Sequence, residues 1–322
     1  MNRPQIAVTG ITGFLGKHLL EKLVLLNFSG IVFNRYSLFF RQSFKEIQVS
    51  NLSDYDGFKS DLVGVNCVIH CAARSHIMND VAVDALAQYR SVNTEGTLNF
   101  ARQAEAAGVK RFIFISSIKV NGEITSISNP FTAADNHNPR DPYGISKSEA
   151  EKQLLELGDK TGMEIVIIRP TLVYGPGVKA NFASLMNLVS KGIPLPFGCI
   201  TQNKRSLVSI TNLVDLIITC IDHPKAANQV FLVSDDHDIS TSEMVCEMAR
   251  ALDKPAWQVP IPICCYKLVG KLFNKSDVVD RLTSSLQVDI SHTKETLGWK
   301  PPQTLQEGFK QTAQAFLQAK TK

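Results

Sequence analysis

The sequence lacks paired cysteines and blocks of like charge. Its seven cysteines are odd in number and none forms a CxxC pair, so a reducing compartment is expected and a disulfide framework is not. The net charge is only +4 and no run of basic residues occurs, which argues against a nucleic-acid partner. We therefore expect neither nucleic-acid binding nor a metal site.

The chain also lacks a hydrophobic run long enough to cross a membrane. Its stretch Leu207–Ile221 is short and is interrupted by Asn212 and Asp215. The first ten residues contain no long apolar segment of the kind that marks a secretion signal. We expect a cytoplasmic protein without membrane insertion, although contact with a membrane through a partner stays open.

What the sequence does contain is a regular alternation of short apolar runs and helical patterns. This alternation predicts an α/β fold with a parallel sheet that is covered by helices on both faces, which is the doubly wound Rossmann type. From about Pro170 the loops become rich in proline and glycine, and we expect a smaller C-terminal lobe there. The predicted division is residues 1–170 for dinucleotide binding and 171–322 for substrate binding, interleaved as one compact unit. The predicted strands are Gln5–Thr9, Gly30–Asn34, Glu46–Val49, Cys67–His70, Arg111–Ser116, Glu164–Arg169 and Val230–Ser234, and the predicted helices include Phe14–Leu26, Val83–Ala107 and Tyr143–Leu157.

A glycine-rich turn, Gly10 to Gly16 with the pattern GxxGxxG, follows the first predicted strand and opens a helix. Glycines there allow a tight turn and close approach of a pyrophosphate, which the free N–H groups of the new helix attract. The second strand ends at Asn34 and Arg35, where NAD-binding proteins carry an acidic residue that accepts hydrogen bonds from a ribose. Arg35 can instead bind a 2′-phosphate, so NADP(H) is favoured over NAD(H), with Arg41 as a second candidate.

A tyrosine and a lysine, Tyr143 and Lys147, share one face of a predicted helix because they are four residues apart. The lysine ammonium is expected to lower the pKa of the tyrosine, which makes the phenol usable for proton transfer near neutral pH. Ser117 directly follows the fifth predicted strand, at the edge of the sheet where such folds bind ligands. These three residues predict a site for hydride-transfer chemistry.

Taken with these motifs, the sequence resembles the extended short-chain dehydrogenases of the NAD-dependent epimerase/dehydratase family. The resemblance covers nearly the whole chain and is carried by TGITGFLG, VIHCAA, VNTEGTLN, FISSIKVNG, DPYGISK, IIRPTLVYGPG and LGWKP. It implies catalytic roles for Ser117, Tyr143 and Lys147. The cofactor-binding residues that it implies, together with the glycine turn and Arg35, are Gly10, Thr12, Gly13, Phe14, Leu15, Gly16, Arg35, Asn51, Leu52, Cys71, Ala72, Ala73, Tyr143 and Lys147.

The resemblance also implies a nucleotide-sugar site in the C-terminal lobe. Two departures from the family pattern matter: Asn121 stands where a tyrosine is usual and is expected to alter the sugar pocket, and Asn51 stands where an aspartate is usual. Arg205 and Arg281 also have a plain reading as surface ion pairs. The implied substrate-binding residues are Ser117, Asn121, Tyr143, Asn181, Leu195, Phe197, Arg205 and Arg281.

Three functions remain open from the sequence. The favoured one is a 4-reductase that acts on a UDP-4-keto-6-deoxy-N-acetylhexosamine, with Tyr143 as proton donor, because the chain most resembles bacterial enzymes of surface polysaccharide (O-antigen) synthesis. The second is a UDP-hexose 4-epimerase, on UDP-glucose or UDP-N-acetylglucosamine, with tightly bound NAD. The third is a non-catalytic NAD(P)-binding scaffold. A homodimer formed through Val83–Ala107 and Tyr143–Leu157 is expected by analogy with the family.

Overall fold

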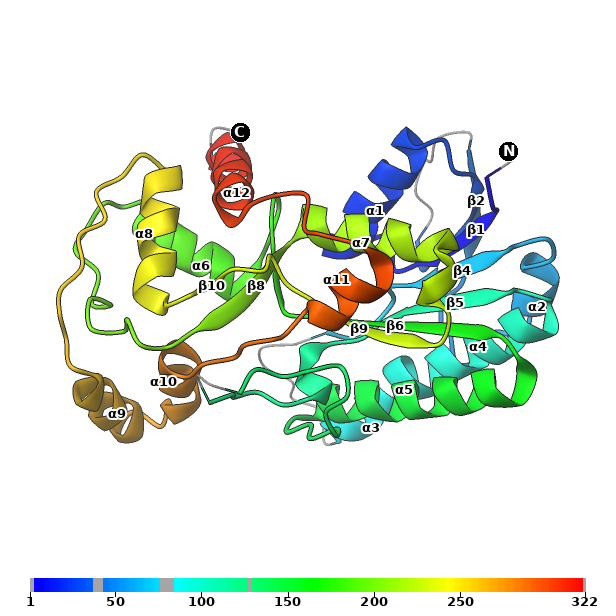
Figure 1. Ribbon diagram of the computed structural model, residues 1–322, viewed down its shortest axis with the longest axis horizontal. Helices are drawn as coiled ribbons and strands as arrows, with labels where there is room; N and C mark the ends of the chain where they lie inside the picture. Colours follow the sequence, from blue (N-terminus) through cyan, green and yellow to red (C-terminus); the bar gives the residue numbers. More distant parts are fainter. Residues whose placement is uncertain (1–2, 37–42, 76–83, 127–128, 321–322) are drawn as a thin grey trace.

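The computed structural model describes residues 3–36, 43–75, 84–126 and 129–320. Its larger part is a seven-stranded, wholly parallel sheet in the order β3-β2-β1-β4-β5-β6-β9 (Figure 1). The direction of winding reverses between β1 and β4, and ligands bind at such a reversal, beyond the carboxyl ends of the strands. The strands are β1 (Ile6–Thr9), β2 (Gly30–Asn34), β3 (Phe44–Gln48), β4 (Cys67–His70), β5 (Arg111–Ile115), β6 (Glu164–Pro170) and β9 (Gln229–Val233).

Helices cover both faces of this sheet, so its central strands are buried on both sides. Alternate residues of β1 enter different cores: Val8 packs toward one face and Ala7 toward the other. The predicted doubly wound fold is confirmed. One face carries α1 (Phe14–Leu25), α7 (Ile210–Asp222) and α11 (Ser291–Leu297), and the other carries α2 (Phe58–Asp61), α3 (Ala85–Arg90), α4 (Gly96–Ala106) and α5 (Pro142–Thr161).

A smaller lobe lies beside the sheet and has its own apolar core. Stacked rings of Tyr174 and Phe182, with Phe309 against both, occupy its centre. The larger unit takes β9 and α7 from beyond residue 170, so the two units are interleaved along the chain. The lobe contains a three-stranded sheet of β10 (Asp238–Ile239), β8 (Arg205–Ser209) and β7 (Leu172–Tyr174), with α6 (Ala180–Val189), α8 (Thr241–Ala251), α9 (Ile263–Leu272), α10 (Ser276–Thr283) and α12 (Leu305–Lys320).

The long helix predicted over Val83–Ala107 is interrupted, and its first residue lies outside the described part of the chain, as does Arg41. A π-helical turn, η1 (Ser91–Glu95), separates α3 from α4. Asn93 in this turn bonds both the backbone of Arg74 and the hydroxyl of Ser146 on α5. Such turns often mark functional sites, and this one fixes the chain after β4 against the helix that carries Tyr143 and Lys147.

The ends of α5 follow simple capping rules. Asp141 caps the first turn by accepting a hydrogen bond from the Gly144 N–H, and Pro142 occupies the first helical position. Gly162 ends the helix in a left-handed conformation. Two further short helical turns are η2 (Ile118–Val120) and η3 (Pro224–Ala226). None of the helices in the described part of the chain combines the length and hydrophobicity that a membrane crossing requires.

Candidate active site

The glycine turn sits between β1 and α1 and meets the chain that leaves β4. Gly10 has a positive φ of 73°, and a Cβ there would lie 2.5 Å from the backbone nitrogen of Ala72. A Cβ on Gly16 would lie 2.2 Å from the Gly10 carbonyl oxygen. Both positions therefore need glycine. Gly13 begins α1 without a side-chain cap, and the first turn has no acidic residue, so its N–H groups suit a phosphate.

A cavity of about 770 Å³ opens at this turn and runs to the ends of β2 and β3. Its size and its position at the sheet reversal fit a dinucleotide. Phe14, Leu15 and Gly16 lie in the first turn of α1 beside it. The predicted cofactor residues that line it are Gly10, Thr12, Gly13, Arg35, Asn51, Leu52, Cys71, Ala72 and Ala73.

At the end of β2 the buried residue is Asn34 and not Arg35, to which the sequence analysis assigned the cofactor contact. Arg35 is exposed, whereas Asn34 is 6% exposed. The Asn34 amide nitrogen donates to the Glu46 carboxylate, and its Oδ1 has no hydrogen-bond partner among the described residues. A buried acceptor left open costs free energy unless a ligand satisfies it. Asn34 is therefore suited to accept a ribose hydroxyl, a role that sequence reasoning did not assign to it.

Asn51, one of the predicted cofactor-binding residues, makes local hydrogen bonds. Its Oδ1 accepts from the backbone and hydroxyl of Ser53, and its amide nitrogen donates to Asp54 at 2.7 Å. The carbonyl of Leu52 accepts from Asn99 at 2.8 Å. These bonds shape the rim of the cavity, so Asn51 serves the loop conformation in this structure.

A buried histidine holds the chain after β4 in place. Nδ1 of His70 lies 3.0 Å from the Thr9 hydroxyl and Nε2 lies 3.1 Å from the Thr97 hydroxyl. Thr9 in turn accepts from the Ala72 N–H at 3.2 Å. Burial, with a smaller effect of Lys147, lowers the pKa of His70 to about 3, so the ring stays neutral. These hydrogen bonds fix the backbone at the edge of the cavity, and they were not predicted from the sequence.

The three predicted catalytic residues come together at the ends of β5 and α5. Ser117 follows β5, Tyr143 lies in the first turn of α5, and Lys147 lies one turn further on. Ser117 and Tyr143 are hydrogen bonded to each other. Nζ of Lys147 donates to the Ile115 carbonyl at 2.8 Å and lies 4.3 Å from the centre of the Phe114 ring. The arrangement places a hydroxyl pair one helical turn from a buried amine.

The pKa values in this group correct one expectation. Burial and the nearby Asp141 carboxylate raise the pKa of Tyr143 to about 12, although its bond with Ser117 lowers it. Burial lowers the pKa of Lys147 to about 7, opposed by Cys71 and Glu151. The predicted lowering of the Tyr143 pKa by Lys147 is thus not seen in the protein alone, because loss of solvent is the larger effect on both groups.

An ion-pair network beneath these residues also escaped the sequence analysis. Glu151 and Arg169 are both buried and form an ion pair. Arg169 also donates to Oδ1 of Asn121 at 2.9 Å, and Nδ2 of Asn121 donates to the Thr132 carbonyl. Asn121 is 2% exposed and both ends of its amide are bonded within the protein. Its predicted contact with the sugar is therefore replaced here by a role in supporting the loop after Ser117.

In the smaller lobe the structure brings Arg205 and Arg281 together. Nη1 of Arg205 donates to the Arg281 carbonyl at 3.0 Å, and burial and the charge of Arg281 lower the pKa of Arg205. Among the described residues neither arginine has an ion-pair partner, so the plain reading as ion pairs is not supported and an anion is favoured. Asn181 is exposed in the first turn of α6.

Leu195 and Phe197 lie in a different environment from the one predicted. Their side chains are 3% and 8% exposed and belong to the core of the smaller lobe. The backbone of Leu195 is bonded to Trp257 and Val259. Packing explains both residues without a ligand, and their side chains are not available for the substrate-binding role that the resemblance implies.

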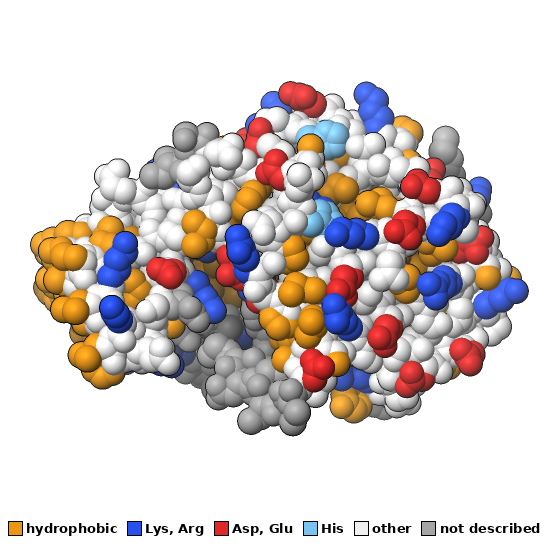
Figure 2. All heavy atoms as spheres, turned by 90° about the horizontal axis from the view of Figure 1, so that it is seen from below, with side chains coloured by type: hydrophobic (Ala, Val, Ile, Leu, Met, Phe, Trp, Pro, Cys, Tyr) orange, Lys and Arg blue, Asp and Glu red, His pale blue; other side chains and the backbone are white. Residues whose placement is uncertain are grey.

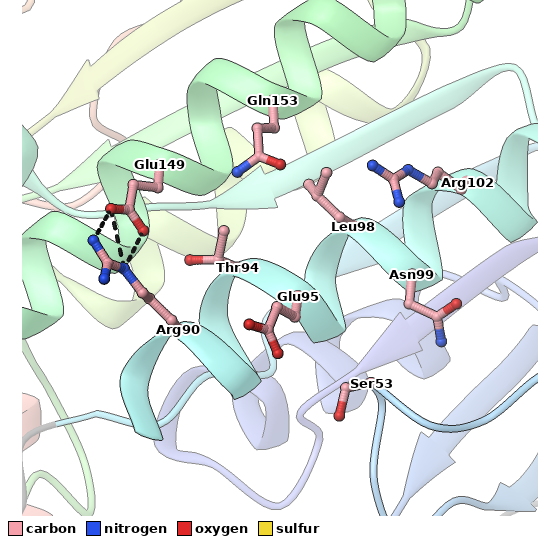
Figure 3. Close-up of a pocket in the computed structure, with 9 residues that line it drawn as sticks. All are labelled: Ser53, Arg90, Thr94, Glu95, Leu98, Asn99, Arg102, Glu149 and Gln153. Carbon is pink, nitrogen blue, oxygen red and sulfur yellow. Dashed lines mark hydrogen bonds and ion pairs between the residues drawn. The ribbon is translucent and has the colours of Figure 1, made fainter. Parts of the chain in front are cut away.

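A second cavity, of about 530 Å³, lies on the outer side of the molecule between η1, α4 and α5 (Figure 3). It is polar, and the ion pair between Arg90 and Glu149 closes one end. Glu95 and Arg102 also line it. The predicted catalytic residues do not line it, and apart from Ser53 its lining comes from the two segments predicted to form a dimer.

Comparison with known proteins extends these observations. Residues 6–234 match the model of the "NAD dependent epimerase/dehydratase family". A Vibrio cholerae protein named UDP-glucose 4-epimerase is 66% identical over 314 residues, which are 98% of this chain and 96% of that protein. An Escherichia coli O157:H7 protein named N-acetyl-alpha-D-glucosaminyl-diphospho-ditrans,octacis-undecaprenol 4-epimerase is 30% identical over 336 residues, or 98% and 96% of the two chains. The structure of Thermotoga maritima UDP-glucose 4-epimerase with UDP-glucose is similar at a TM-score of 0.78 and 22% identity, covering 98% of this chain and 99% of that one.

Proposed function

The chain belongs to the NAD-dependent epimerase/dehydratase family, and from this premise we propose that it is a 4-epimerase of a hexose carried on UDP. The observation that carries the proposal is the 66% identity to the Vibrio cholerae protein over almost the whole chain. It supports the epimerase alternative better than the 4-reductase that the sequence analysis favoured. The family and its name likewise favour NAD over the NADP suggested by Arg35.

The geometry of Ser117 and Tyr143 supports the proton transfer that epimerisation needs. The Gly10–Gly16 turn and the cavity beside it would hold a dinucleotide, whose nicotinamide would supply reversible hydride acceptance at C4. Ser117 and Tyr143 are assigned to the C4 oxygen, because their hydroxyls are already hydrogen bonded to each other. Tyr143 takes the proton of the C4 hydroxyl while the C4–H bond breaks, and it gives the proton back when that bond forms again.

Lys147 is assigned to stabilise the phenolate form of Tyr143. With a pKa of about 12 in the protein alone, Tyr143 needs a nearby positive charge to act near neutral pH. The Lys147 ammonium uses one donor on the Ile115 carbonyl and has two more. Its position one helical turn from Tyr143 on α5 makes it the charged group best placed for this role.

The diphosphate of the carrier is assigned to Arg205 and Arg281. The names of both relatives specify a sugar linked through a diphosphate, to a nucleoside in one case and to a polyprenol in the other. Two guanidinium groups that have no acidic partner among the described residues suit a diphosphate. Asn181, exposed at the start of α6, is assigned to the same anion.

The test is turnover of UDP-glucose and UDP-N-acetylglucosamine by purified protein without an added reductant, followed by NMR of the C4 proton. We expect interconversion of the C4 epimers, and NAD that co-purifies with the protein and is released when the protein is denatured. Tyr143→Phe should lower kcat at least a thousandfold while substrate binding is retained, in line with the usual size of acid–base effects. Consumption of NADPH with a UDP-4-keto-6-deoxy sugar, and no epimerisation, would contradict the proposal.

A further inference from the structure

The end of the smaller lobe exposes a group of apolar side chains on α9 and the turn after it. Leu268, Val269, Leu272 and Phe273 are 70%, 53%, 76% and 67% exposed. We call these four residues the α9 surface. Figure 2 shows hydrophobic side chains gathered at this end of the molecule, on the left, with basic side chains beside them. A cluster of large exposed apolar residues marks an interaction site on most proteins.

The backbone arrangement explains why these residues remain outside the core. Gly270 is buried where α9 crosses α10, and a Cβ there would lie 2.6 Å from Cγ2 of Val279. That close crossing uses one side of α9. Leu268 and Leu272 are one turn apart, as are Val269 and Phe273, so the four side chains form a stripe that α10 does not cover.

The charge on α9 itself is of one sign. Lys267 and Lys271 are exposed one turn apart on α9 beside the apolar stripe, and Lys275 is exposed after the turn that ends this helix. No aspartate or glutamate occurs from Lys254 to Ser276. Two aspartates, Asp277 and Asp280, follow this segment on α10, and Asp280 is exposed. A helix with leucine and phenylalanine beside several lysines has the composition of an interfacial membrane helix.

We propose that the α9 surface docks on a bilayer that contains anionic phospholipids. Protein interfaces are depleted in lysine at their centres, whereas lysines beside an apolar stripe are attracted by the negative charge of a membrane. The apolar side chains then enter the boundary between head groups and acyl chains. This proposal rests on the exposed surface alone and does not depend on the epimerase assignment.

Docking there has a consequence for the reaction site. α9 packs on α10, and α10 carries Arg281, whose carbonyl binds Arg205. The two arginines assigned to the diphosphate are therefore one helix away from the docking surface.

The experiment is sedimentation of the purified full chain with vesicles of phosphatidylcholine alone or mixed with phosphatidylglycerol, at low and at high salt. We expect binding to the mixed vesicles only, weakened by salt. Leu272→Glu/Phe273→Glu should abolish it, and Lys267→Gln/Lys271→Gln should weaken it roughly 30-fold, from about 1 kcal/mol for each lysine. Leu25→Glu on α1, which is 72% exposed, and Lys160→Gln on α5 are matched controls that should bind as the wild type does.

Two results would overturn the proposal. One is equal sedimentation, or none, for the wild type and the Leu272→Glu/Phe273→Glu variant with mixed vesicles. The other is a dimer or a complex with a second protein that this variant loses while vesicle binding stays absent, which assigns the surface to a protein. Because these side chains lie outside the core, thermal unfolding and turnover of UDP-glucose should be unchanged and serve as the check on folding.

Discussion

Arg169 and Glu151 form a buried ion pair directly beneath the residues assigned to catalysis. Nε of Arg169 donates to both carboxylate oxygens of Glu151, at 3.0 and 3.1 Å. The same carboxylate accepts the hydroxyl of Ser116, the neighbour of Ser117. Glu151 lies on α5 one turn after Lys147, so the pair fixes the end of β5 and the helix α5 relative to each other.

Removing one partner of this pair should be far worse than removing both. Glu151→Leu leaves the Arg169 guanidinium buried without its carboxylate, and we expect a loss of about 3–5 kcal/mol in the free energy of unfolding. The double variant Glu151→Leu/Arg169→Met should recover much of that loss. Urea unfolding of the three proteins measures the difference. Equal losses for the single and double variants would show that the pairing of charges is not what matters.

Lys147 should make the protein less stable and is retained for its chemistry. Its pKa of about 7 lies below the usual 10.5, so the folded state binds this proton more weakly than the unfolded state. The resulting penalty is complete below pH 7 and disappears as the pH rises toward 10.5. Lys147→Met should thus raise the melting temperature near pH 7 by several degrees and abolish turnover. Calorimetry from pH 7 to 10 tests this, since the gain must shrink with rising pH.

The choice between NAD and NADP should depend on Glu46 as well as on Arg35. Glu46 bonds the Asn34 amide and places a negative charge beside the open Oδ1 of Asn34, which would repel a 2′-phosphate. Glu46→Gln keeps the size of the side chain and should raise relative affinity for NADPH about tenfold. Arg35→Asp should shift preference toward NADH. Titration of each variant with both reduced cofactors measures the ratio, and an unchanged preference in Arg35→Asp would remove Arg35 from the site.

The sequence predicted the sheet well because its strands are short apolar runs between helices of clear periodicity. β2 and β4 have the predicted bounds, and the glycine turn and Ser117, Tyr143 and Lys147 lie where a strand end or a helix face puts them. The positions of those three residues could thus be predicted largely from local sequence patterns. By contrast, the ion pair of Glu151 and Arg169 is formed by tertiary packing of two residues that are 18 positions apart in the sequence, and no spacing rule predicts it.

No helix was predicted from the sequence over α9 or α10. Periodicity identifies a helix when its apolar stripe faces the core, but much of the apolar stripe of α9 faces solvent. The π-helical turn η1 was missed because it depends on the bonds of Asn93 to a loop and to α5, which a single stretch of sequence does not contain.

The outer cavity offers a test of the predicted dimer. Glu95 at the end of η1 and Arg102 on α4 are both exposed and line this cavity. In a twofold dimer through this face, the same patch meets itself, so Glu95 of one protomer can lie opposite Arg102 of its partner. Arg102→Glu then places like charges together and should weaken dimerisation by at least tenfold. Light scattering over a dilution series measures this, with Lys110→Glu, exposed outside the cavity, as the control; a wild type that stays monomeric at all concentrations would refute the dimer.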